Sequence, residues 1–199
     1  SQALDASVLR AMQIVVERAL IPDPADVDAL RDSARPLLAD PVLERDPARY
    51  FAFVEQPLPP LVVSSRRRRA IPGGRVVSRR LTSEYRAYPY ATASPATAPV
   101  GLSVSNGDPI LLEHWMHEGA AATRGTVVAI HGFAMGRPRI DALALFAREW
   151  FDRGLDVALI TLPHHGARTP AGARFSGEWF AVPHVTRVAE SVREALYEI

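Results

Sequence analysis

The feature that most constrains the fold is a pair of short apolar segments with an amphipathic stretch between them. Residues 126–130 read Thr-Val-Val-Ala-Ile, and residues 156–162 read Asp-Val-Ala-Leu-Ile-Thr-Leu. Continuous apolar runs of this kind are typical of strands buried on both faces of a parallel sheet. Between them, apolar residues recur at helical spacing: Ile140, Leu143, Ala144, Ala147, Trp150 and Phe151. Strand, helix and strand in this order predict a βαβ unit with a right-handed crossover, and therefore an α/β fold.

Both predicted strands end in turns that carry polar groups. Residues 131–136 read His-Gly-Phe-Ala-Met-Gly, and residues 163–168 read Pro-His-His-Gly-Ala-Arg. Because the carboxyl ends of parallel strands meet at one edge of a sheet, we expect the two turns to open on the same side. A glycine directly after a buried strand lets the next backbone amides turn into a cleft. Each amide held there can stabilise a developing oxyanion by about 3 kcal/mol.

These residues resemble the α/β-hydrolase superfamily of esterases, lipases and related acyl hydrolases. An apolar strand ending in His-Gly and an aromatic residue is similar to that family's oxyanion loop, here residues 127–136. The second turn resembles the family's Pro-Gly-His-Gly-x-Ser turn, with His164 in place of the first glycine and Arg168 in place of the serine. The resemblance covers residues 109–199. It implies a partial α/β-hydrolase sheet, from the early strands through the strand after the oxyanion loop.

The resemblance also implies a site. It assigns the backbone N–H of Phe133, together with that of Ala134, to an oxyanion hole. His131 would shape the turn instead of acting as a base. The other residues of the two turns that would line the substrate site are Gly132, His164 and His165. The implied reaction is hydrolysis of a small-molecule ester or related acyl bond by a serine nucleophile, without a cofactor.

The chain departs from the family in lacking the nucleophile motif Gly-x-Ser-x-Gly. Residues 101–105 lack the second glycine and precede the oxyanion strand, and Ser176 has no strand before it. The last helix predicted, with an apolar face of Val185, Val188, Val192, Leu196 and Ile199, ends where the nucleophile strand should begin. In the family's strand order, the edge of strand 126–130 would then be open, which favours aggregation. We therefore expect the remaining half of the domain in a second polypeptide or another segment, or its replacement by self-association.

The rest of the chain divides into a helical N-terminal segment, residues 1–60, and the first half of a hydrolase domain, residues 61–199. Helical spacing over residues 4–20 and again from Asp23 to Ala34 predicts two helices. We interpret the four arginines of residues 66–69 as a solvated loop and not as an anion or nucleic-acid site, because no aromatic residues are interleaved with them. An exposed strand is expected over residues 75–86, a linker over 88–99 and a strand near residues 110–115.

Composition excludes several classes of function. All 23 basic residues are arginine and there is no cysteine, so disulfides, thiolate nucleophiles, cysteine zinc sites and lysine Schiff bases are ruled out. A net charge of +1 gives no reason to expect nucleic acid as a partner. We find no apolar run long enough for a membrane span and no basic start of a signal peptide, so a cytoplasmic location is the default expectation.

Other candidate residues have a structural and a functional interpretation. His131, His164 and His165 could hold zinc, but no carboxylate is suitably spaced with them, so we favour a role in the turns and predict no metal. His114 and His117 should point to opposite faces of a strand, and His184 should begin a helix.

Asp141 and Asp156 could each be the acid of a catalytic triad. We favour a structural role for both, because Asp141 fits the first turn of a helix and Asp156 begins a strand at the end away from the turns. Arg168 could hold a substrate carboxylate, although we favour a surface salt bridge; Trp179 and Phe180 fit a substrate pocket or the core equally well.

A second function stays open from the sequence. Because a fold does not determine a function, the chain could be a non-catalytic binding or assembly protein that keeps the α/β scaffold without the nucleophile half.

Overall fold

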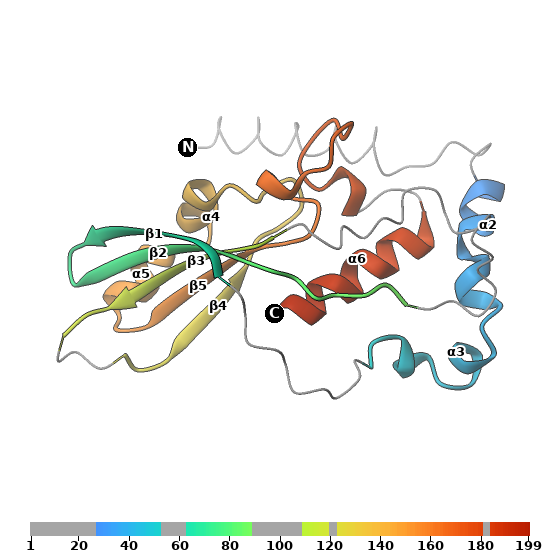
Figure 1. Cartoon of the computed structure of the whole chain (residues 1–199), viewed down its shortest axis with the longest axis horizontal. Coiled ribbons are helices and arrows are strands. Elements are labelled where there is room, and N and C mark those ends of the chain that lie inside the picture. Colours follow the sequence, from blue (N-terminus) through green and yellow to red (C-terminus); the bar gives the residue numbers. More distant parts are fainter. Residues whose placement is uncertain (1–26, 53–62, 89–108, 120–122, 181–183) are drawn as a thin grey trace, which may run out of the picture.

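A computed structural model describes residues 27–52, 63–88, 109–119, 123–180 and 184–199. They form a mixed α/β domain with one five-stranded sheet and flanking helices (Figure 1). The predicted α/β class is confirmed at that level. Several predictions lie outside the described residues: the helix over residues 4–20, the motif-like residues 101–105 and nearly all of the linker at 88–99.

The sheet contains one parallel pair and three antiparallel pairs of strands. Its strands are β1 (Val63–Ile71), β2 (Gly74–Leu81), β3 (Ile110–His117), β4 (Thr126–Ile130) and β5 (Asp156–Thr161). Their order across the sheet is β1-β2-β3-β5-β4. Only β4 and β5 are parallel, with Thr126 opposite Asp156 and Ile130 opposite Ile160. The two turns that the sequence singled out therefore follow neighbouring strands at the same end of the sheet.

The arginine run belongs to a strand, so its interpretation as a loop is wrong. β1 and β2 form a hairpin in which Ile71 lies opposite Gly74. Pro72 and Gly73 connect them, and Gly73 has a φ of +83°, as a type II turn requires at its third position. Charged side chains on an edge strand oppose pairing with other chains. The predicted exposed strand over residues 75–86 ends earlier, at Leu81, and its Val76 and Val77 are buried.

The two apolar strands differ in their surroundings. Every residue of β5 is buried, as predicted. Val128 and Ile130 of β4 are 47% and 44% exposed, so the prediction that both faces of this strand are buried is wrong in this structure. Exposed and half-buried residues alternate along β4, so the described residues leave one face of this strand uncovered. Among the described strands, β4 also lies at the edge of the sheet and pairs with β5 alone.

The single helix predicted between these strands is two short helices. α4 (Pro138–Ala144) and α5 (Ala147–Asp152) are separated by Phe146, whose φ of +55° interrupts the helix. The break turns much of the expected apolar face outward, since Leu143 is 79% exposed. Ala147 and Phe151 of α5 are buried in the main hydrophobic core, together with Val76, Trp115, Val157 and Leu159.

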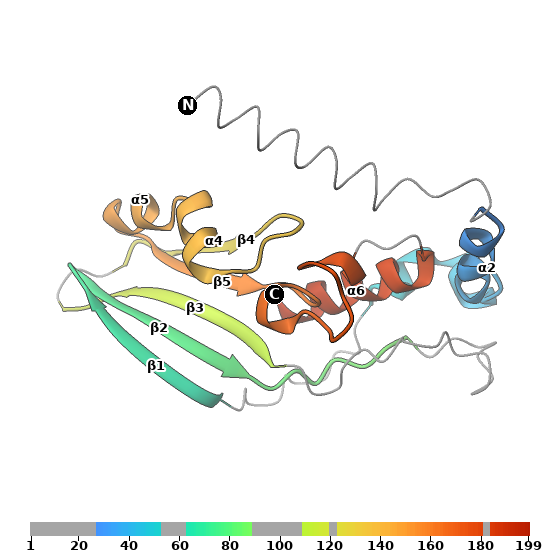
Figure 2. The same ribbon diagram turned by 90° about the horizontal axis from the view of Figure 1, so that it is seen from above.

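The last helix, α6 (Val185–Glu198), lies beyond the carboxyl ends of β4 and β5 and not over the sheet (Figure 2). The described residues leave much of its predicted apolar face uncovered. Val185, Leu196 and Ile199 are exposed, while its buried residues are mostly polar: Thr186, Glu190, Ser191, Arg193 and Glu194. No helix in the described ranges has the length and apolar character needed to cross a bilayer.

The buried side of α6 holds the N-terminal helices through polar contacts. These helices are α2 (Val27–Leu38), α3 (Pro41–Arg45) and the 3-10 helix η2 (Pro47–Tyr50). Tyr50 and Tyr85 donate their hydroxyl hydrogens to the carboxylate of Glu190, at 2.5 and 2.7 Å. Arg193 donates to the carbonyl of Tyr50 at 2.6 Å. Burial, and the nearby negative charge of Glu190, raise the pKa of Tyr85, so its hydroxyl stays a donor.

Candidate functional site

Two loops meet at the carboxyl ends of the parallel strands. The β4 loop comprises residues 131–136 and the β5 loop residues 162–168. They touch backbone to backbone at Gly136 and Gly166, whose φ angles are +104° and +54°. A Cβ atom at Gly166 would lie 1.8 Å from the carbonyl oxygen of Gly136. Only glycine fits at this contact, which fixes the spacing of the two loops.

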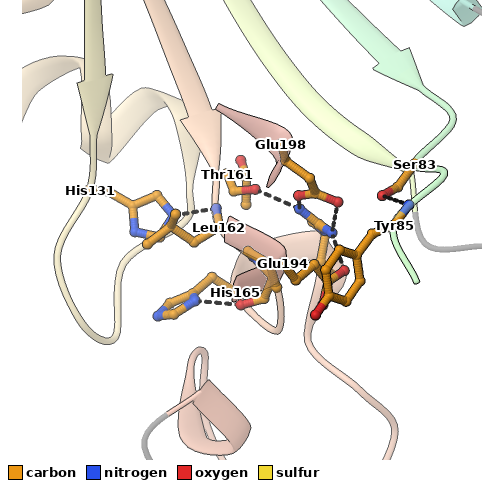
Figure 3. A network of polar contacts seen from close by, with 10 residues as sticks. Ser83, Tyr85, His131, Thr161, Leu162, His165, Glu194 and Glu198 are labelled. Carbon is orange, nitrogen blue, oxygen red and sulfur yellow. Dashed lines mark hydrogen bonds and ion pairs between the residues drawn. The ribbon is translucent and has the colours of Figure 1, made fainter. Parts of the chain in front are cut away.

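His131, directly after β4, ties its loop to the end of β5 (Figure 3). Its Nε2 accepts the backbone N–H of Leu162 at 3.1 Å, and its Nδ1 lies 2.9 Å from the carbonyl oxygen of Gly132. Because Nε2 faces a donor, Nδ1 carries the proton and donates it to that carbonyl. The side chain is buried with both nitrogens engaged, an arrangement suited to positioning the loop.

The β4 loop forms a tight turn that leaves two successive amides unused. Met135 N–H donates to the carbonyl of Gly132 at 3.3 Å, and Ala134 has a φ of +62°, as in a type II turn. Phe133 and Ala134, the two residues of the predicted oxyanion hole, occupy its central positions. Within the described part of the chain, neither of their N–H groups has a hydrogen-bond acceptor. Gly132 and Ala134 are exposed and Phe133 is half-buried.

The β5 loop repeats this geometry. His165 N–H donates to the carbonyl of Leu162 at 3.2 Å, with Pro163 and His164 between them. His164 has a φ of +62°, a conformation that favours glycine. His164, which stands where the resembling motif has its first glycine, therefore occupies a position where glycine would be less strained.

His165 lies at the centre of the assembly, with 1% of its surface exposed. Its Nδ1 donates to the carbonyl of Pro163 at 2.8 Å, while its Nε2 has no hydrogen-bond partner in the described structure. The rings of His131 and Phe180 pack against it at centroid distances of 4.9 and 5.3 Å. Burial lowers the pKa of His165 to about 4, so the ring is neutral at physiological pH.

Ser176 is a structural residue of the site that sequence reasoning did not identify as such. Its hydroxyl accepts the N–H of Gly166 at 2.8 Å and donates to the carbonyl of Met135, so it bridges the two loops. The next residue, Gly177, donates its N–H to the carbonyl of His164 at 2.9 Å. The bridge to Met135 joins residues 41 positions apart, so no local pattern could have signalled it.

Arg168 is buried, which contradicts the prediction of a surface salt bridge. One guanidinium nitrogen donates to Glu198 at 2.6 Å and to the carbonyl of Thr161 at 3.0 Å. The other donates to Glu198 at 3.0 Å and to Glu194 at 3.3 Å. Figure 3 shows Thr161, Glu194 and Glu198 gathered at this point, where the β5 loop joins α6. Both terminal nitrogens of the guanidinium are bound by the protein, and the Nε–H is buried without a hydrogen-bond partner among the described residues, so Arg168 is not arranged to hold a substrate carboxylate.

The two aspartates considered as triad acids lie in structural positions, as expected. Asp141 is buried in α4 and accepts the N–H of Gly136 at 3.2 Å. Asp156 begins β5, at the end opposite the loops, and its Oδ1 is 2.9 Å from Nδ1 of His117. His114, on the other face of β3, contacts Arg79.

The remaining candidates surround the loops without adding a reactive group. His184 caps the start of α6 by accepting the N–H of Arg187, as predicted. The guanidinium of Arg187 lies 4.8 Å from the ring centroid of Trp179. Among the described residues, no three histidine or acidic side chains lie close enough together to hold a metal ion. The site therefore offers free backbone donors beside a neutral, buried histidine.

Comparisons with known proteins assign no family. No protein-family model matches the chain, and no curated protein matches it significantly.

Proposed function

We propose that this chain is part of a serine hydrolase that cleaves an ester or related acyl bond, and that it supplies one side of the oxyanion hole. The observation that carries the proposal is the pair of unused amides at Phe133 and Ala134, in a rigid turn directly after a parallel strand. Backbone amides fixed before the reaction are effective oxyanion donors, because they need no reorganisation when charge develops on the substrate oxygen.

The arrangement around the amides fits this role. His131 and Ser176 each bind the β4 loop to the neighbouring loop, and the Gly136–Gly166 contact leaves no room for either loop to approach further. In the proposed reaction, a serine attacks the substrate carbonyl, and the tetrahedral oxyanion accepts hydrogen bonds from Phe133 N–H and Ala134 N–H. An acid–histidine pair elsewhere activates that serine.

We place the nucleophile outside the 199 residues. Ser176 donates its hydroxyl proton to a carbonyl, and the sequence holds no Gly-x-Ser-x-Gly. The free edge of β4, with half-exposed Val128 and Ile130, offers a place for a further strand. In the resembling family, the nucleophile strand pairs at this edge. The strand order β3-β5-β4 supports a partial α/β-hydrolase sheet.

Removing one amide hydrogen tests the proposal. Proline is favoured at the second position of a type II turn, so Phe133→Pro removes the donor while fitting the backbone. Hydrolysis of p-nitrophenyl acetate would be measured on the chain purified with its associated polypeptides. The expected result is a fall in kcat of about 100-fold or more with little change in KM.

Phe133→Leu is the matched control, since it changes the side chain and keeps the N–H. It should retain most of the activity, and circular dichroism should confirm that both variants are folded. Equal activity of the proline variant and the wild type would contradict the oxyanion role. No hydrolysis by a well-folded wild-type sample would favour the non-catalytic binding or assembly function.

A further inference from the structure

An open cavity of about 950 Å³ lies between the face of strands β1–β3 and α4, beside the β4 loop and separate from it. Val76 and Trp115 form its floor, and Ile140 and Leu143 of α4 form part of its wall. Its dominant feature is a group of arginines, which we call the arginine cluster: Arg67 and Arg69 from β1, with Arg137 and Arg139 at the start of α4.

The strand register directs the β1 arginines toward this cavity. Arg69 lies opposite Val76, which lies opposite Trp115, and all three line the cavity. The Arg69 guanidinium is 5.9 Å from the ring centroid of Trp115. Trp115 also contacts Phe151 of α5, so these side chains lie on the sheet face that α5 covers.

Within the described part of the chain, a single carboxylate faces the four arginines of the cluster. Glu113 is the one carboxylate that lines the cavity in the described structure, and it accepts the indole N–H of Trp115 at 3.1 Å. No described carboxylate forms an ion pair with any of the four arginines, whereas Arg148 at the rim pairs with Asp152 at 2.8 Å. Like charges held around one cavity repel one another, and an anion bound among them relieves that repulsion.

We propose that this cavity binds an organic anion carrying two or more phosphate groups. The planar guanidinium group of arginine binds two phosphate oxygens at once. Four guanidinium groups are more than one phosphate group requires, so the cluster fits a ligand with several phosphates. The volume falls within the range of about 300–1,000 Å³ typical of small-molecule sites. Ile140 and Leu143 are exposed at the wall, so they can contact the organic part of the ligand.

Titration with ATP in the absence of divalent cations tests this site, by calorimetry on the full chain as purified at low salt. Saturable binding is expected with a Kd of about 1 mM or lower, and adenosine should not bind. The double variant Arg67→Ala, Arg139→Ala should weaken ATP binding by about tenfold or more. The matched control is Arg31→Ala with Arg35→Ala, which also removes two positive charges, here from the exposed side of α2. This control should leave the affinity for ATP unchanged.

Chemical protection gives a second readout that needs no variant. Phenylglyoxal modifies accessible arginines, and mass spectrometry would map the modified positions with and without ATP. ATP should protect the arginine cluster and leave Arg31 and Arg35 reactive. Non-saturable binding, equal weakening in both double variants, or no selective protection would each overturn the proposal. Neither readout involves ester hydrolysis, so failure here is distinct from failure of the proposed function.

Discussion

At the scale of single residues, His165 shows how packing can remove a histidine from acid–base chemistry. Its ring is surrounded by other side chains and by Gly177, where a Cβ atom would lie 2.2 Å from the ring Nε2. Desolvation by this environment, and not a charged partner, is the main cause of its lowered pKa. A ring that resists protonation in the fold and accepts it readily in the unfolded chain couples stability to pH.

We predict that His165 makes the protein less stable in mild acid. Its pKa is about 4 in the fold and about 6.5 in the unfolded chain. The unfolded state therefore binds more protons below pH 6.5, and stability falls as the pH decreases from 6.5 to 4, by up to about 3 kcal/mol. Urea unfolding at several pH values should show this loss. His165→Asn, which cannot titrate, should reduce it; an unchanged slope in the variant would contradict the assignment.

The glycine contact between the loops gives a second prediction at this scale. Gly166→Ala should destabilise the protein by about 3 kcal/mol or more, since its Cβ would meet the Gly136 carbonyl. Gly172→Ala is the control, because Gly172 also has a positive φ, +93°, but no described atom lies within 4 Å of its Cβ position. Backbone strain alone should cost the control about 1–2 kcal/mol. Equal losses in thermal unfolding would show that the loops are not in close contact.

At the scale of elements, α6 is held by its polar face. Arg168 joins the β5 loop to the end of this helix, and its side chain and those of Glu194 and Glu198 are almost completely buried. Removing one partner from a buried ion pair leaves an uncompensated charge, which costs more than the pair contributes.

Arg168→Met should therefore destabilise the protein by about 3–5 kcal/mol, although methionine fills much of the same space. The comparison variant is Arg35→Ala, which breaks the exposed pair with Asp32 on α2 and should cost less than about 1 kcal/mol. Chemical denaturation measures both. A loss below 1 kcal/mol for Arg168→Met would mean that α6 is not anchored by this ion pair.

The elements also show what the sequence could and could not predict. β5 was predictable because every one of its residues is buried, and a continuous apolar run is what a strand buried on both faces requires. The break between α4 and α5 was not, because it depends on one backbone angle, at Phe146. The orientation of α6 could not be inferred from its periodicity, since ion pairs and tyrosine hydroxyls from distant segments bury the polar face.

At the site, local signals located the turns but not the contacts between them. Glycine, proline and histidine after two apolar strands were enough to predict both loops. The hydrogen bond from Ser176 to Met135 and the ion pair of Arg168 with Glu198 join residues 41 and 30 positions apart, and single-sequence patterns do not record such contacts.

At the scale of the whole molecule, two apolar surfaces lack cover from the described residues. One is a face of the edge strand β4, with Val128 and Ile130; the other is the outer face of α6, where Leu196 is 51% exposed. Exposed apolar surface next to a free strand edge is typical of an interaction site. The proposed function explains the β4 edge as the place where the strand that carries the nucleophile pairs.

The most direct test of this account is to locate the reactive serine. A fluorophosphonate probe would be added to the purified chain with everything that copurifies, and the adduct mapped by mass spectrometry. The account predicts an adduct on a serine outside the 199 residues, in a polypeptide that contains Gly-x-Ser-x-Gly. An adduct on Ser176 would contradict it, and so would ester hydrolysis by a sample that contains only these 199 residues.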